Sequence, residues 1–128
     1  MNCYFQLHAG AIRSEQVIEF LRALLRHLRT DVLVVLDGLR AHWSRAVRNF
    51  VESQEGRIAL ERLPAYAPEL NPVEYLWGYW KRNAMANFCP SDFAHLHSKA
   101  RETLTKLRRR KTIITACWAQ AELFSSLY

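Results

Sequence analysis

The feature that most constrains the fold is a run of five consecutive aliphatic residues, 32–36, three of which are valine. Uninterrupted apolar runs of this length are typical of strands that are buried on both faces of a parallel sheet. A helical spacing of apolar residues precedes the run over residues 15–29, and a second helical pattern follows it over residues 43–53. The pattern therefore predicts an α/β fold in which helices cover a parallel sheet.

Further elements are predicted from the same periodicities. Two more short strands are expected, at residues 3–8 and 58–63, and a third helix at residues 72–86. Two more helices are expected, with apolar faces that run from Phe93 to Leu107 and from Ile113 to Leu123 or Phe124. Ser14 and Ser91 are the expected N-caps of the first and fourth helices. Three tryptophans on the later helices are expected to lie in the core: Trp77, Trp80 and Trp118. The alternation of strands and helices, followed by helices alone, predicts at least one parallel strand pair.

Composition narrows the class of protein. The chain has 128 residues and is 50% hydrophobic, which is enough for one domain with a core and too apolar for disorder. No apolar run approaches the ~18 residues of a membrane span, and the N-terminus has no signal-peptide pattern. Three scattered cysteines suit a reducing cytosol better than a disulfide framework. We therefore expect a single cytoplasmic domain over residues 1–128 without a membrane partner.

The positive charge is confined to one part of the chain. Residues 75–128 carry nine lysines and arginines against three acidic residues, whereas residues 1–74 are neutral overall. A one-sided basic surface favours nucleic acid as a partner, although a well-solvated basic tail would give the same counts. The candidate nucleic-acid-binding cations are Lys81, Arg82, Arg108, Arg109, Arg110 and Lys111. Two alternatives stay open. Lys81 and Arg82 could be solvated cations on a helix, and the run 108–111 could be a solvated joint between helices.

Asp37 is the first candidate for chemistry. It follows the aliphatic run directly, and open α/β sheets place their ligands at the carboxyl ends of their strands. The structural alternative is that Asp37-Gly38 is simply a turn. His42 comes five residues later and could orient a water molecule or contact a phosphate, or could be a structural loop histidine.

Glu74 is the second candidate. It follows a stiff loop that contains Pro64 and Pro68, and it stands third in the predicted helix that begins at Pro72. The structural alternative is a capping box, with Asn71 as N-cap and Glu74 reaching back to it.

Two carboxylates from separate elements are the minimum for a divalent metal that prefers oxygen ligands, such as Mg²⁺. Two-metal phosphoryl transfer usually needs about three acids. Beside Asp37 and Glu74, this stretch of chain offers Glu69 as a weaker third.

Two segments carry a resemblance to a known family. They are Leu-Asp-Gly-Leu-Arg-Ala-His-Trp-Ser at residues 36–44 and Leu-Pro-Ala-Tyr-Ala-Pro-Glu-Leu-Asn-Pro-Val-Glu at residues 63–74. Together they resemble the DDE endonuclease domain of bacterial insertion-sequence transposases, most of all the insertion-sequence 630 family, relatives of the mariner transposases. The resemblance covers nearly the whole chain, and the proline-containing segment is the more specific of the two.

The resemblance implies an RNase H-like fold with extra C-terminal helices. It also implies DNA strand cleavage and strand transfer with two Mg²⁺ (or Mn²⁺) ions, acting on transposon ends and target DNA in a bacterial, nucleoid-associated protein. By position, Asp37 matches the second metal-binding acid, Glu74 the third, and His42 the family's histidine. The family's first acid lies on a strand upstream of anything present here.

We therefore expect an N-terminally truncated domain that lacks the first two strands and is inactive alone. The strand at residues 32–36 would have an unpaired apolar edge, which suits a homodimer or the remaining N-terminal part of a transposase as partner. Two other functions stay open: a non-catalytic fragment that binds DNA or a transposase, and an unrelated small α/β domain.

Overall fold

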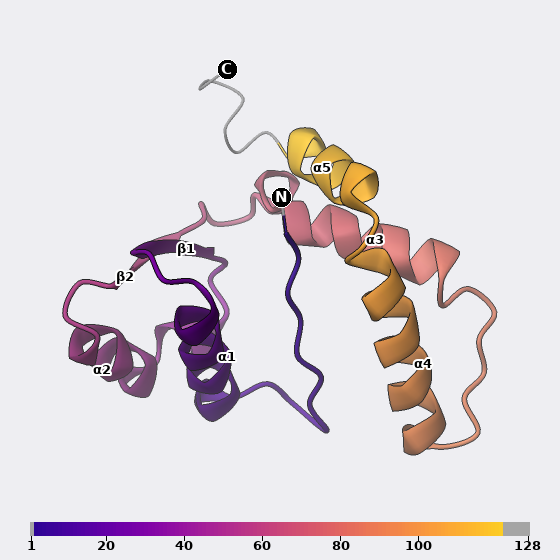
Figure 1. The fold of residues 1–128 in the computed structure, drawn as a ribbon, viewed down its shortest axis with the longest axis horizontal. Helices are drawn as coiled ribbons and strands as arrows, with labels where there is room; N and C mark the ends of the chain where they lie inside the picture. The colour runs from indigo at the N-terminus through magenta and orange to yellow at the C-terminus, as the bar shows by residue number, and fades with distance from the viewer. Residues whose placement is uncertain (1, 122–128) are drawn as a thin grey trace. The chain divides into compact units, whose positions relative to one another are not determined.

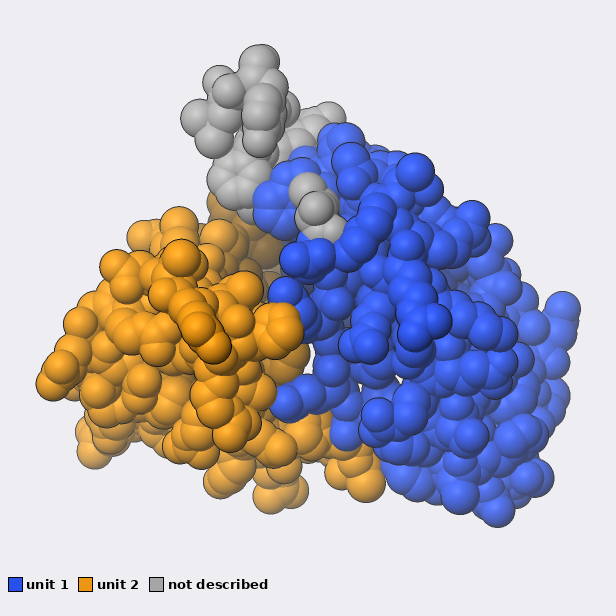
Figure 2. All heavy atoms as spheres, in the orientation of Figure 1, with its two compact units in different colours: residues 1–7, 67–128 blue, residues 8–66 orange. Residues whose placement is uncertain are grey.

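The computed structural model describes residues 2–121. Its elements, in chain order, are α1 (Ser14–His27), β1 (Val32–Leu36), the 3₁₀ helix η1 (Arg40–Trp43), α2 (Arg45–Ser53), β2 (Ile58–Arg62), the 3₁₀ helix η2 (Pro68–Leu70), α3 (Pro72–Asn83), α4 (Phe93–Leu107) and α5 (Lys111–Gln120) (Figure 1). Contacts between residues divide the chain into two compact units (Figure 2). Unit 1 comprises residues 1–7 and 67–128, and unit 2 comprises residues 8–66. That the chain forms one domain stays a prediction.

Unit 2 contains the sheet. Strands β1 and β2 pair in parallel, in a register that runs from Val32 opposite Ile58 to Leu36 opposite Arg62. The intervening helix α2 makes the crossover between them, as a parallel pair requires. The prediction of an α/β chain with a parallel strand pair is confirmed.

Two helices build the core of unit 2 against one face of this sheet. The core residues come from α1, α2 and β2: Val17, Leu21, Leu25, Val47, Phe50 and Ile58. The three residues of α1 are spaced four apart, so they form one stripe on the helix, as its periodicity predicted. Val32 and Val34 of β1 pack against this cluster.

The expectation that β1 is buried on both faces is wrong. Leu33, whose side chain alternates with those of Val32 and Val34, is 61% exposed. Both helices of unit 2 contribute to one cluster on the Val32 and Val34 side. Among the described residues, Leu33 therefore has no comparable cover. An aliphatic run reports high β-propensity and does not by itself show how many faces are covered.

Unit 1 is formed by helices. Its buried residues lie on α4, on α5 and just after α5: Ala100, Leu104, Leu107, Ile114, Cys117 and Ala121. Helix α3 contacts both α4 and α5, but none of its own residues is buried. Trp77 is 39% exposed and Trp118 is 36% exposed, so the expectation that both are core residues is wrong. Trp80 is half-buried and donates a hydrogen bond from Nε1 to Thr103 Oγ1 at 2.9 Å.

The predicted strand at residues 3–8 is wrong. In the part of the chain that the structure describes, this segment belongs to no sheet. Side chains attach the N-terminal residues to the rest of unit 1: Lys111 Nζ donates to Asn2 Oδ1 at 2.8 Å, and the Arg108 guanidinium lies 5.7 Å from the centre of the Phe5 ring. A β-prone segment becomes a strand only where a sheet edge is available to it, and that is a property of the tertiary structure.

Helix starts differ slightly from those expected. Helix α1 has Arg13 as its N-cap, while Ser14 is the first helical residue and its hydroxyl donates to Ser44 Oγ at 2.8 Å. Asp92, not Ser91, caps α4, because its Oδ1 accepts from the His95 backbone N–H at 2.8 Å. Helix α3 ends three residues before its expected end, and residues 122–124 of the last predicted helix lie outside the described residues. Between residues 2 and 121, no helix has the length and apolar character needed to cross a membrane.

Candidate functional site

Asp37 follows β1 directly and has a defined local geometry. Its Oδ1 accepts a hydrogen bond from the Leu39 backbone N–H at 3.0 Å, and its backbone carbonyl accepts one from Trp43 Nε1 at 2.7 Å. The carboxylate therefore closes the Asp-Gly turn that the sequence suggested. Its side chain is still 47% exposed, and no described residue forms a hydrogen bond with its second oxygen. The turn and an outward ligand role are compatible, because they use different oxygens.

His42 lies in η1 and faces the same carboxylate. Its Nδ1 is 2.9 Å from Asp37 Oδ1, and its side chain is only 19% exposed. The direction of approach does not suit a hydrogen bond, and no other described group supplies one to this buried nitrogen. The contact is therefore an ion pair when the imidazole is protonated, and it fixes the two side chains beside each other.

Glu74 stands at the third position of α3. Asn71 caps this helix as predicted, since its Oδ1 accepts from the Val73 backbone N–H at 3.1 Å. The capping box does not close, because the Asn71 backbone N–H donates instead to the Pro68 carbonyl at 3.0 Å. Glu74 is exposed, and its carboxylate forms no hydrogen bond or ion pair with any residue in 2–121. The helix start thus leaves this carboxylate available to a ligand.

The donor chemistry of the two acids suits a hard cation. Each presents carboxylate oxygens, which are the ligands that Mg²⁺ and Mn²⁺ prefer, and neither offers a sulfur or a competing salt bridge to lysine or arginine. Asp37 belongs to unit 2 and Glu74 to unit 1. Glu69 lies in η2 and is exposed. Within residues 2–121, no group of three or more histidine, cysteine or acidic side chains is gathered as a metal site would need.

The candidate cations all belong to unit 1, on α3 and at the joint between α4 and α5. Lys81 and Arg82 lie in the exposed last turn of α3. The run 108–111 connects α4 to α5, and three of its four residues have specific partners. Arg110 Nη1 donates to the Tyr79 hydroxyl at 3.0 Å, in addition to the contacts of Arg108 and Lys111 with the N-terminal segment. The run is therefore an exposed joint that is tied down by its own side chains.

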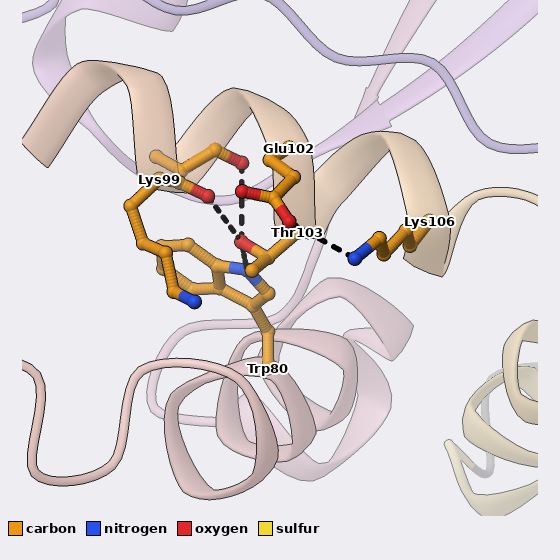
Figure 3. A network of polar contacts seen from close by, with 6 residues as sticks. Trp80, Lys99, Glu102, Thr103 and Lys106 are labelled. Carbon is orange, nitrogen blue, oxygen red and sulfur yellow. Dashed lines mark hydrogen bonds and ion pairs between the residues drawn. The ribbon is translucent and has the colours of Figure 1, made fainter.

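A third group of residues, which the sequence patterns did not predict, lies between α3 and α4. Trp80, Lys99, Thr103 and Lys106 line one hollow there. Figure 3 shows the hydrogen bond from Trp80 to Thr103 and the pairing of Lys106 with Glu102. The three α4 residues are spaced by four and three positions, so they share one face of that helix. That spacing was the sequence signal for this group, but it could be recognised only with knowledge of which face of α4 meets α3.

Comparison with known proteins adds the family. A family model described as DDE superfamily endonuclease matches residues 2–96, which is most of the chain and includes both candidate acids. The chain belongs to the DDE endonuclease superfamily. No curated protein and no solved structure matches it. The match to the DDE superfamily includes all of unit 2 and the first helix of unit 1's bundle, and it ends near the start of α4.

Proposed function

We propose that this DDE superfamily chain is part of the catalytic domain of a DNA transposase of the insertion-sequence 630 type, related to the mariner transposases. Its reaction would be strand cleavage followed by strand transfer. The observation that carries the proposal is the placement of the two acids within the matched region: Asp37 directly after a strand of a parallel pair, and Glu74 at a capped helix start. The same arrangement supports an RNase H-like fold, in which β1 and β2 would be two of the parallel strands.

Asp37 and Glu74 are the residues that would hold the metal ions. Mg²⁺ or Mn²⁺, when bound, would polarise the scissile phosphodiester and lower the pKa of the attacking group, which is water in cleavage and a DNA hydroxyl group in strand transfer. The chain's own contribution is to orient the ligands. The Leu39 N–H and His42 hold one oxygen of Asp37 and leave the other free to bind, while Asn71 fixes the start of α3 without engaging Glu74. The helix N-terminus also favours a carboxylate at that position.

A working centre needs more acid than these two residues supply, because two-metal sites are held by about three carboxylates. We expect the 128 residues alone not to cleave DNA. Strand β1 pairs with β2 on one edge, and no strand among the described residues pairs with its other edge. That edge is where a strand of another polypeptide, either a second copy or the N-terminal part of a transposase, would bind and bring a further acid.

A nicking assay tests this function. Supercoiled plasmid is incubated with Mg²⁺ or Mn²⁺ and the chain, with and without a polypeptide that carries the first strands and first acid of an insertion-sequence 630 transposase. We expect nicking only with both polypeptides, and loss of nicking in Asp37→Asn and in Glu74→Gln. The exposed Glu52→Gln on α2 is the matched control and should keep full activity. Equal nicking by all variants would refute the assignment of Asp37 and Glu74 as metal ligands. Strong nicking by the chain alone would refute the proposal that its catalytic centre lacks an acid.

The second candidate is a fragment that binds DNA or a transposase without catalysis. The confinement of the excess positive charge to residues 75–128, together with the fixed run 108–111, favours it. It predicts DNA binding that does not depend on divalent metal and weakens steeply with salt. Replacing the four residues of the run by glutamine should reduce the magnitude of the salt slope by up to ~3.6 for duplex DNA, at ~0.9 per contact. An unchanged slope would remove the run from the contact surface.

A further inference from the structure

A hollow of about 280 Å³ lies inside unit 1, between α3, α4 and the joint that leads to α5. Its walls include the side chains of Tyr79, Trp80, Lys99, Lys106 and Arg110. The α4 and joint residues come after residue 96, so they lie beyond the region that matches the DDE superfamily. The volume is close to the lower end of the range for small-ligand sites, ~300–1,000 Å³.

The aromatic wall of the hollow is fixed in place. Trp80 Nε1 donates to Thr103 Oγ1 at 2.9 Å, and the same hydroxyl donates to the Lys99 carbonyl at 2.8 Å (Figure 3). The polar edge of the indole is thus satisfied by α4, one turn along from Lys99. A ring held in this way offers its apolar surface at little cost in conformational entropy.

The rim of the hollow carries three cations and, among its lining residues, no acid. Arg110 Nη1 donates to the Tyr79 hydroxyl at 3.0 Å, which leaves its other N–H groups for a ligand. Lys106 Nζ is 2.9 Å from Glu102 Oε1, but the two side chains are 72% and 56% exposed, and pairs so exposed are weak. Lys99 Nζ lies 5.7 Å from the centre of the Phe88 ring. An anion would therefore meet cations that no strong salt bridge holds.

We propose that this hollow binds one nucleotide unit of a single DNA strand. The phosphate is held by Lys99, Lys106 and Arg110, and the base lies against the aromatic side chains of Tyr79 and Trp80. Cations beside a fixed aromatic surface are the combination by which proteins hold single strands, and the hollow has room for one nucleotide and not for a duplex. The choice of DNA as the source of the nucleotide rests on the proposed function. The pairing of cations with aromatic side chains in the hollow is observed independently of that function.

The first test is the salt dependence of binding to a labelled single-stranded oligonucleotide, measured by fluorescence anisotropy in EDTA. Lys99→Gln/Lys106→Gln should lower the magnitude of the log–log salt slope by about 1.4, at ~0.7 per contact for a single strand. Between 50 and 200 mM salt, the unaltered chain should then lose about sevenfold more affinity than this variant. Arg26→Gln/Arg48→Gln removes the same charge from exposed positions of unit 2 and is the matched control. Equal slopes for the two double variants would overturn the proposal.

The second test locates the base. An oligonucleotide that carries 5-iododeoxyuridine is photocrosslinked to the full chain, and the attached residue is identified by mass spectrometry. We expect crosslinks at Tyr79 or Trp80, and their loss in Lys99→Gln/Lys106→Gln. Crosslinks confined to other aromatic residues would overturn the proposal. Because both tests are made in EDTA, they do not depend on the metal site, so failure of the metal site and failure of the hollow give different results.

Discussion

The Asp37 turn allows the structural and the functional roles of one carboxylate to be separated. Asp37→Ala removes the acceptor of the Leu39 N–H, at 3.0 Å, and the partner of His42, at 2.9 Å. An average hydrogen bond contributes about 0.5–1.5 kcal/mol to stability, and an exposed ion pair about 0–1 kcal/mol. Because the Asp37 side chain is 47% exposed, we expect the low part of the combined range, about 1 kcal/mol.

Asp37→Asn should behave differently, because an amide oxygen can accept the same hydrogen bond from Leu39. We expect its free energy of unfolding to change by less than about 0.5 kcal/mol, since only the weak ion pair is lost. Both variants should lose binding of Mn²⁺, because alanine offers no ligand atom and a neutral amide is a poor substitute for a carboxylate ligand. Urea unfolding followed by circular dichroism measures the first effect, and the electron paramagnetic resonance signal of free Mn²⁺ measures the second. An Asn variant as unstable as the Ala variant would contradict the hydrogen-bonding role of Asp37, and one that binds Mn²⁺ normally would contradict its role as a ligand.

Three further outcomes follow from the structure. Glu74→Gln should change the free energy of unfolding by no more than about 0.3–1 kcal/mol, because only the interaction of the carboxylate with the helix dipole is lost. Asn71→Ala should lower the free energy of unfolding in urea by about 1 kcal/mol, because Asn71 caps α3. Leu21→Ala should destabilise unit 2 by about 2–5 kcal/mol, since Leu21 is 2% exposed, and a smaller loss would contradict its place in the core. The hydrogen bond and charge of Lys106 hold the pKa of Glu102 below its ordinary value. This pair therefore stabilises the fold above the unfolded-state pKa of Glu102, and the stabilisation is lost as pH falls through the folded-state pKa. In Lys106→Gln, a carboxyl titration by NMR should show a higher pKa for Glu102, and an unchanged pKa would contradict the pairing.

Local patterns predicted the parts of the fold that depend on local chemistry. The stripe of α1 that includes Val17 and Leu21 follows from helical periodicity, and the start of α3 follows from Asn71 and Pro72. The pairing of β1 with β2 follows from the helix between them, because a crossover of that kind joins parallel strands.

The features that the sequence did not predict depend on which elements meet. The exposure of Leu33 depends on which face of the sheet the helices cover, and the absence of a strand at residues 3–8 depends on where a free sheet edge lies. Glu74 was compatible with a capping box until the Pro68 carbonyl was seen to take the Asn71 N–H. The hollow beside Trp80 requires α3 and α4 to be adjacent, which no periodicity in either helix specifies.

The proposal to be tested above all is that Asp37 and Glu74 hold the same metal ions. Iron-directed cleavage tests it most directly: Fe²⁺ replaces Mg²⁺, ascorbate and peroxide generate hydroxyl radicals at the ion, and the cut positions in the chain are mapped by mass spectrometry. We expect cuts near both residues 37 and 74, and loss of both sets of cuts in either Asp37→Asn or Glu74→Gln, but not in Glu52→Gln. Cuts near only one acid, or cuts near one acid that persist when the other is replaced, would contradict a shared site.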